Sequence, residues 1–106
     1  MTYEVIYMKA DFEPWWMFEE WETMVKSRRS FSTVNEAQEY FYKIKGELEK
    51  SHAHSAQKND CFFAFWSDQE QFFCEGCDEN LQLYHGIILM VDGKPSPHIL
   101  RNNSNI

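Results

Sequence analysis

Residues 33–48 read TVNEAQEYFYKIKGEL, and this stretch carries the clearest secondary-structure signal in the chain. Thr33 and Glu36 have the spacing of a capping box, in which a Thr and a Glu three residues later each accept the other's backbone N–H at a helix start. Five apolar residues then recur at helical spacing and form one narrow stripe: Val34, Ala37, Phe41, Ile44 and Leu48. The stretch therefore predicts an amphipathic helix with one face on a core.

The segment before this helix is dense in tryptophan. Residues 13–22 read EPWWMFEEWE and hold three of the four tryptophans of the chain. Because Pro14 suits the first turn of a helix, we predict a helix over residues 14–26, followed by a polar connector through residue 30. On that helix Trp16 falls on the charged side with Glu19 and Glu20, so a core does not explain it. Trp16 is therefore a candidate contact residue; the alternative is a helix that packs between the sheet and the C-terminal tail and buries Trp16 as well.

Strands are predicted on both sides of the two helices. Alternating residues predict a strand over 2–9, and the apolar run 61–66 predicts a central strand covered on both faces. Residues 51–60 have no periodicity and indicate a loop. Two further strands are predicted over 70–74 and 81–91, with a turn between them.

This order of elements predicts an α+β fold, with two helices packed on one face of a mostly antiparallel sheet of about four strands. We expect residues 1–97 to form a single domain. The polar residues 98–106 are predicted to be a flexible C-terminal tail.

The charge of the chain limits its partners. The formal net charge is −7, and the stretches 11–22 and 60–92 hold acids but no Lys or Arg. Such surfaces repel phosphates, which argues against nucleic acids and anionic membranes as partners. No apolar run approaches the roughly 20 residues that span a bilayer, and the N-terminus lacks the pattern of a signal peptide. With three cysteines, an odd number, a disulfide framework is not indicated, and we expect a cytoplasmic protein.

The sharpest motif is Cys74-Glu75-Gly76-Cys77. Two thiolates at this spacing can bind one zinc ion. A closed site needs two more ligands, and the available residues, none of which forms a second pair at zinc-finger spacing, are Cys61, His52, His54, His85 and His98. The neighbouring acids raise thiol pKa values, which disfavours a redox centre. The alternative, which we prefer, is a turn that carries two structural thiols and binds no cofactor.

His85 falls on the apolar face of its strand with Leu83 and Ile87. A catalytic base could lie there, but a core histidine bonded to a carbonyl group is the simpler interpretation. The chain has no nucleophile motif and no phosphate-binding loop. A non-enzymatic function is therefore favoured over an enzyme.

Aromatic residues make up 17% of the chain, roughly twice ordinary usage. Trp16, Tyr42 and Tyr84 lie on the less apolar faces of their predicted elements. Exposed aromatic residues beside acids such as Glu19 and Glu20 are typical of protein-binding surfaces. We therefore predict a protein-interaction module that binds a protein partner or a second copy of itself.

Three stretches also carry a resemblance to a known family: residues 13–22, the segment FFCEGCDENLQ at 72–82, and DGKP at 92–95. Together they are similar to a small family of uncharacterised proteins from low-GC Gram-positive bacteria, which is classed as a domain of unknown function. The resemblance extends to about residue 97. It implies a cytoplasmic bacterial protein, and it supplies no activity, cofactor or catalytic residue.

Overall fold

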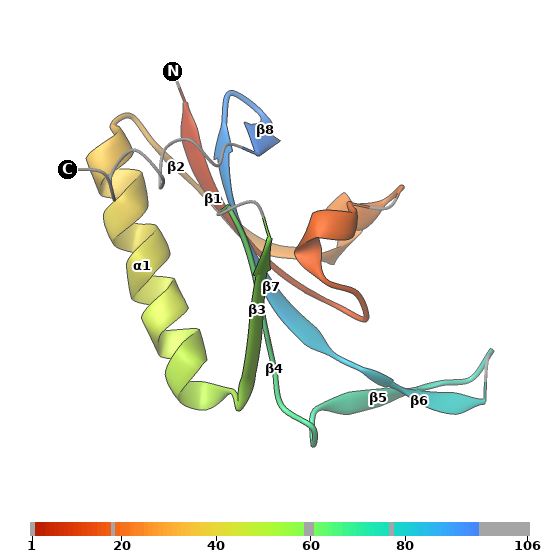
Figure 1. Cartoon of the computed structure of the whole chain (residues 1–106). Coiled ribbons are helices and arrows are strands. Elements are labelled where there is room, and N and C mark those ends of the chain that lie inside the picture. The colour runs from red at the N-terminus through yellow and green to blue at the C-terminus, as the bar shows by residue number, and fades with distance from the viewer. Residues whose placement is uncertain (1, 18, 59–60, 77, 96–106) are drawn as a thin grey trace.

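The computed structural model describes residues 2–17, 19–58, 61–76 and 78–95, and its centre is a six-stranded antiparallel sheet (Figure 1). The strand order is β2-β1-β7-β4-β3, and β8 pairs with β7. The bounds are β1 (Tyr3–Ala10), β2 (Val25–Phe31), β3 (His54–Lys58), β4 (Phe62–Trp66), β7 (Tyr84–Val91) and β8 (Lys94–Pro95). Two further strands, β5 (Gln71–Cys74) and β6 (Glu79–Gln82), pair as a hairpin that extends away from the sheet (Figure 1).

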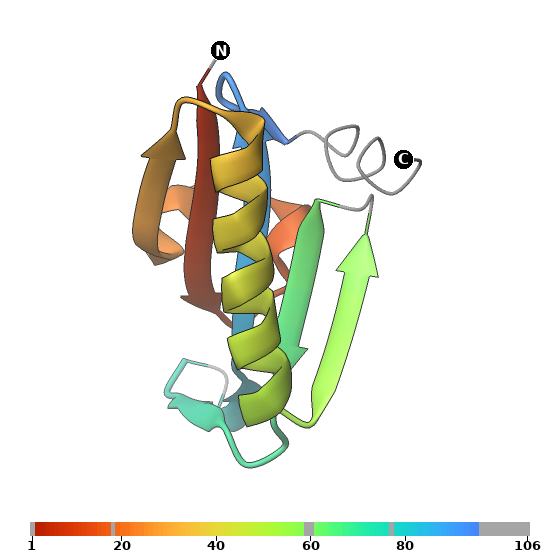
Figure 2. The same cartoon turned by 90° about the vertical axis from the view of Figure 1, so that its left-hand side faces the viewer.

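One α-helix, α1 (Val34–Ser51), lies along one face of the sheet (Figure 2). Its start has the predicted Thr33 N-cap, because the Thr33 hydroxyl oxygen accepts the Glu36 N–H at 3.3 Å, and the same hydroxyl donates to Glu36 Oε1 at 2.9 Å. Phe41 of α1 is fully buried and meets Phe63 of β4 edge to face, with ring centroids 5.3 Å apart. The helix predicted over residues 33–48 is therefore confirmed.

The register of the two central strands determines which residues face α1. Val5 of β1 pairs with Leu89 of β7, Tyr7 with Ile87, and Lys9 with His85. Because side chains alternate along a strand, these pairs lie on the α1 side of the sheet. Ile6 and Met8 of β1 and Ile88 of β7 point to the other side, and all three are buried.

The tryptophan-rich segment covers that other face, and the predicted helix over residues 14–26 is wrong. The segment forms two short 3₁₀ turns, η1 (Pro14–Trp16) and η2 (Trp21–Met24). Met17 has φ 43° and Glu20 has φ 71°, and left-handed residues end an α-helical hydrogen-bond ladder. The prediction of two helices on one face is therefore overturned: within the described residues there is one α-helix, and the tryptophan-rich segment lies across the sheet from it (Figure 1).

Pro14 fixes this segment to the sheet. A Cβ atom added at Gly86 of β7 would lie 2.9 Å from both Cβ and Cγ of Pro14 and 3.1 Å from Cγ of Met8. Only a glycine lets the proline ring approach the central strand this closely.

The predicted sheet of about four strands is also wrong, because strands lie in segments that lack apolar alternation. The predicted connector holds β2, an edge strand with three basic residues, and the predicted loop 51–60 holds β3. The predicted strand 81–91 is two strands, β6 and β7, which separate at Leu83, whose N–H donates to the Glu70 carbonyl at 3.1 Å. The strands predicted over 2–9, 61–66 and 70–74 are confirmed as β1, β4 and β5.

Helix α1 carries many charged residues, and no helix within the described ranges is long and apolar enough to cross a membrane.

Candidate metal centre

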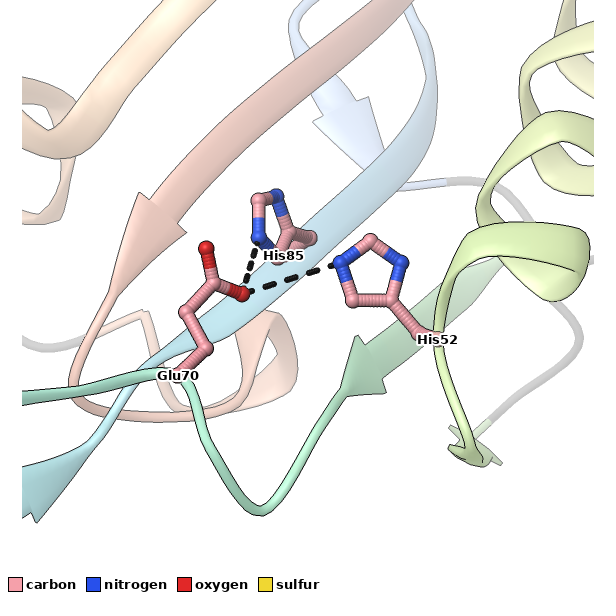
Figure 3. A group of neighbouring side chains, drawn as sticks. All are labelled: His52, Glu70 and His85. Carbon is pink, nitrogen blue, oxygen red and sulfur yellow. Dashed lines mark hydrogen bonds and ion pairs between the residues drawn. The ribbon is translucent and has the colours of Figure 1, made fainter.

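Three ionisable side chains from distant segments meet near the C-terminal end of α1 (Figure 3). His52 follows α1 directly, Glu70 immediately precedes β5, and His85 lies in β7. Glu70 Oε1 is 2.6 Å from His85 Nε2 and 3.6 Å from His52 Nε2. One potential ligand atom from each residue lies within 4.8 Å of the other two, so one carboxylate oxygen faces two imidazole nitrogens.

The end of α1 sets the orientation of His52. The Leu48 carbonyl accepts the His52 backbone N–H at 3.0 Å and lies 3.0 Å from His52 Nδ1. In the tautomer with the proton on Nδ1, this N–H donates to the Leu48 carbonyl, because a carbonyl oxygen can only accept. The Ser51 hydroxyl, whose oxygen lies 3.0 Å from the same nitrogen, then donates to the Glu47 carbonyl at 3.0 Å. In a neutral His52 ring, Nε2 then presents its lone pair to the Glu70 carboxylate.

His85 has an oxygen partner at each ring nitrogen. Its Nδ1 lies 2.5 Å from the Tyr7 hydroxyl, and its Nε2 contacts Glu70. Burial lowers the pKa of His85 and outweighs the opposing effect of Glu70, so the ring is neutral at pH 7. Without a bound cation, the Nε2–H therefore donates to the carboxylate and the Tyr7 hydroxyl donates to Nδ1.

Lys9 supplies the positive charge next to this cluster, with its Nζ 3.4 Å from Glu70 Oε2. Burial would raise the pKa of Glu70, but the hydrogen bond from His85 and the charge of Lys9 together hold that pKa below its ordinary value. Burial and the nearby Glu70 raise the pKa of Tyr7. At pH 7 Glu70 is therefore an anion and Tyr7 a neutral phenol.

The cluster lies just beneath the surface. The His52 and His85 side chains are 11% and 10% exposed, whereas Glu70 and Lys9 are 32% and 36% exposed. Solvent therefore reaches the site from the side of Glu70 and Lys9. A pocket of about 220 Å³ lies next to the site, between α1, β1 and β2. Its lining includes Tyr7 and Leu48, which contact the two histidines, and the other lining residues are Ser27, Tyr40, Ile44 and Glu47.

The structure does not bring Cys61 to His85. Cys61 is fully buried at the start of β4, and the cross-strand partner of His85 is Phe65. Four residues of extended strand separate Cys61 from Phe65, a distance of about 13 Å. Cys77 is outside the described residues, as is the side chain of Cys74, so zinc binding by this pair stays a prediction.

The residues predicted to bind a partner do not share one surface. Trp16 is 52% exposed on η1, and the Lys58 ammonium lies 5.6 Å from its ring centroid. Tyr84 lies on the same side of the sheet, where its ring contacts Trp66. Tyr42 is 44% exposed but belongs to α1, on the opposite side. Glu19 and Glu20 are exposed between the two 3₁₀ turns, near Trp16 in the chain.

Sequence reasoning missed Glu70, and it considered His52 only as one of several possible ligands for the cysteine pair. Neither has a partner at a recognisable ligand spacing, because 18 and 15 residues separate His52 from Glu70 and Glu70 from His85. His85 was predicted to bond a carbonyl group, but its partners are Tyr7 and Glu70. The signals available in the sequence were His85 on an apolar strand face and a histidine, His52, four residues after the predicted helix.

Fold and site together define a small antiparallel α+β protein with a partly exposed cluster of His52, Glu70 and His85. A family profile described as "Protein of unknown function (DUF1033)" matches residues 2–104, and the chain belongs to this family. Among the curated proteins and the solved structures nothing matches the chain.

Proposed function

We propose that this protein binds a divalent transition-metal ion, zinc being the first candidate, through His52, Glu70 and His85. The observation that carries the proposal is the orientation of His52. Its Nδ1 is bonded to the Leu48 carbonyl, and its Nε2 lies 3.6 Å from a carboxylate oxygen. With the His52 proton on Nδ1, Nε2 and the carboxylate oxygen are two acceptors that need a proton or a metal ion between them. A metal ion bound to both imidazole nitrogens and the carboxylate satisfies all three groups.

The donor set suits this chemistry. Two imidazoles and one carboxylate are found in catalytic zinc sites and in non-haem iron sites. Zinc ligand atoms at about 2.0–2.1 Å from the ion lie roughly 3.3 Å apart. The contact between His52 and Glu70 is near that value, and the shorter contact between His85 and Glu70 would open by less than about 1 Å once the metal replaced the proton on Nε2.

Each histidine also has the outer-shell partner that metal ligands need. Metal-bound histidines usually donate their other ring N–H to an oxygen, which fixes the tautomer and the ring orientation. The Leu48 carbonyl does this for His52, and the Tyr7 hydroxyl oxygen would accept the Nδ1–H of a metal-bound His85. Three protein ligands leave at least one position for water or a further ligand.

The test is zinc titration of metal-free protein, followed by calorimetry and native mass spectrometry. We expect one ion per chain and a loss of at least 100-fold in affinity in Glu70→Gln and in His52→Ala. His54→Ala is the matched control, because His54 lies two residues from His52 and contacts Asp68 rather than the cluster.

A double variant, Cys74→Ser with Cys77→Ser, separates this site from the cysteine pair. If that variant loses zinc while Glu70→Gln retains it, the ion belongs to the cysteines and the proposal is wrong. Equal zinc affinity in Glu70→Gln and the parent protein would contradict it as well.

A second candidate function is protein binding through Trp16. Its 52% exposure makes it one of the four large hydrophobic side chains that the described structure leaves exposed. Tryptophan is enriched among residues that dominate binding energy, so Trp16→Ala should weaken self-association by about 2 kcal/mol. Sedimentation equilibrium would measure this, and a monomeric parent protein would exclude a dimer through this surface.

A further inference from the structure

We propose that the metal-loaded centre binds a small oxyanion, a carboxylate or a phosphate group, between the metal ion and the Lys9 ammonium. This inference rests on the proposed metal site, and it assigns the class of ligand that the site takes.

The metal-loaded site carries a net positive charge. A divalent ion held by two neutral imidazoles and the Glu70 carboxylate leaves a net charge of +1, and Lys9 raises this to +2. In a chain with a formal net charge of −7, such a spot attracts anions locally. An anionic ligand is therefore favoured over a neutral or cationic one.

Lys9 lies where it can contact a ligand of the metal ion. Lys9 lies directly opposite His85 in the pairing of β1 with β7, so both side chains project from the same face of the sheet. The Lys9 Nζ lies 3.4 Å from the Glu70 oxygen that does not face the histidines. At 36% exposure Lys9 is on the solvent side of the site, where an incoming ligand arrives. One oxygen of a carboxylate or phosphate can coordinate the ion while a second accepts from Lys9.

Lys9 also acts on the metal ion itself. A fixed positive charge next to a cation site repels the ion, so Lys9 weakens metal binding. The position of Lys9 therefore does not improve metal affinity. The same position lets its ammonium group donate to the second oxygen of a metal-bound anion. The two effects of removing Lys9 therefore have opposite signs, which makes the proposal testable.

The experiment uses the whole chain loaded with Co²⁺, whose visible absorption reports its coordination. Acetate and inorganic phosphate are titrated separately at low millimolar concentrations. The preferred oxyanion is the one that saturates the change in Co²⁺ absorption at the lower concentration. We expect Lys9→Met to bind Co²⁺ as tightly as the parent protein or more tightly, and to bind the oxyanion at least 10-fold more weakly. Lys26→Met, at an exposed position of β2, is the matched control and should behave as the parent protein.

Equal oxyanion affinity in Lys9→Met and the parent protein would overturn the inference, as would a spectrum that neither anion changes. Both results leave the metal site intact. A parent protein that binds no Co²⁺ and no Zn²⁺ would instead overturn the proposed function, and this inference with it.

Discussion

The contact between Pro14 and Gly86 makes a sharp prediction about stability. In Gly86→Ala the new Cβ would lie 2.9 Å from two Pro14 atoms, whereas carbon atoms in contact prefer about 3.5–4.0 Å. The proline ring would have to retreat by about 0.6 Å or more, and overpacking of this kind costs about 1–3 kcal/mol. Alanine returns about 0.4–1 kcal/mol by restricting the unfolded chain. We expect a net loss of about 1–2 kcal/mol in the free energy of unfolding.

Gly46→Ala is the matched control. Gly46 lies inside α1, and an added Cβ there meets no atom within 4 Å. Alanine is favoured over glycine in a helix by about 1 kcal/mol, so this variant should be more stable than the parent protein. The same chemical change is thus expected to have opposite signs at the two positions.

Urea denaturation followed by tryptophan fluorescence is the assay, because three of the four tryptophans lie in the segment that Pro14 fixes to the sheet. We expect the midpoint to fall in Gly86→Ala and to rise in Gly46→Ala, with similar slopes. A Gly86→Ala protein as stable as Gly46→Ala would refute the docking of the tryptophan-rich segment on β7.

Three further predictions concern α1 and the His52, Glu70 and His85 cluster. Thr33→Ala removes the side-chain acceptor for the Glu36 N–H and should reduce the free energy of unfolding by about 1 kcal/mol, measured in urea. Tyr7→Phe removes the oxygen next to His85 Nδ1 and should weaken zinc binding by about 10- to 100-fold in a calorimetric titration, with the fold unchanged by circular dichroism. Because the pKa of His85 is lowered from 6.5 in the folded protein, the unfolded chain takes up the extra proton first as the pH falls below that value. Metal-free protein should therefore lose stability below about pH 6.5, and His85→Gln should reduce this loss in urea titrations at several pH values.

The sequence was most informative where periodicity and capping agree. The stripe from Val34 to Leu48 and the Thr33–Glu36 pair predicted α1, and the apolar run 61–66 predicted the buried strand β4. These signals are local, because helix spacing and burial leave a pattern in consecutive residues.

The failures have physical reasons. β2 is an edge strand whose inner five residues are all exposed, so burial imposes no alternation on it. The tryptophan-rich segment has helical spacing, but left-handed backbone at Met17 and Glu20 lets it lie flat on the sheet. The His52, Glu70 and His85 cluster exists only because α1, the approach to β5 and strand β7 converge, and no local pattern encodes that convergence.

The order of the strands also bears on how the chain folds. β1 (Tyr3–Ala10) has β7 (Tyr84–Val91) as a neighbour, so the centre of the sheet joins residues about 80 positions apart. Helix α1 and the strand pairs β1–β2 and β3–β4 can form from nearby residues, but the two pairs join in one sheet only through β7. Folding rates fall as contacts become more distant in sequence, so we expect slow, late closure of this sheet. On the ribosome, the core could form only after β7 had left the exit tunnel.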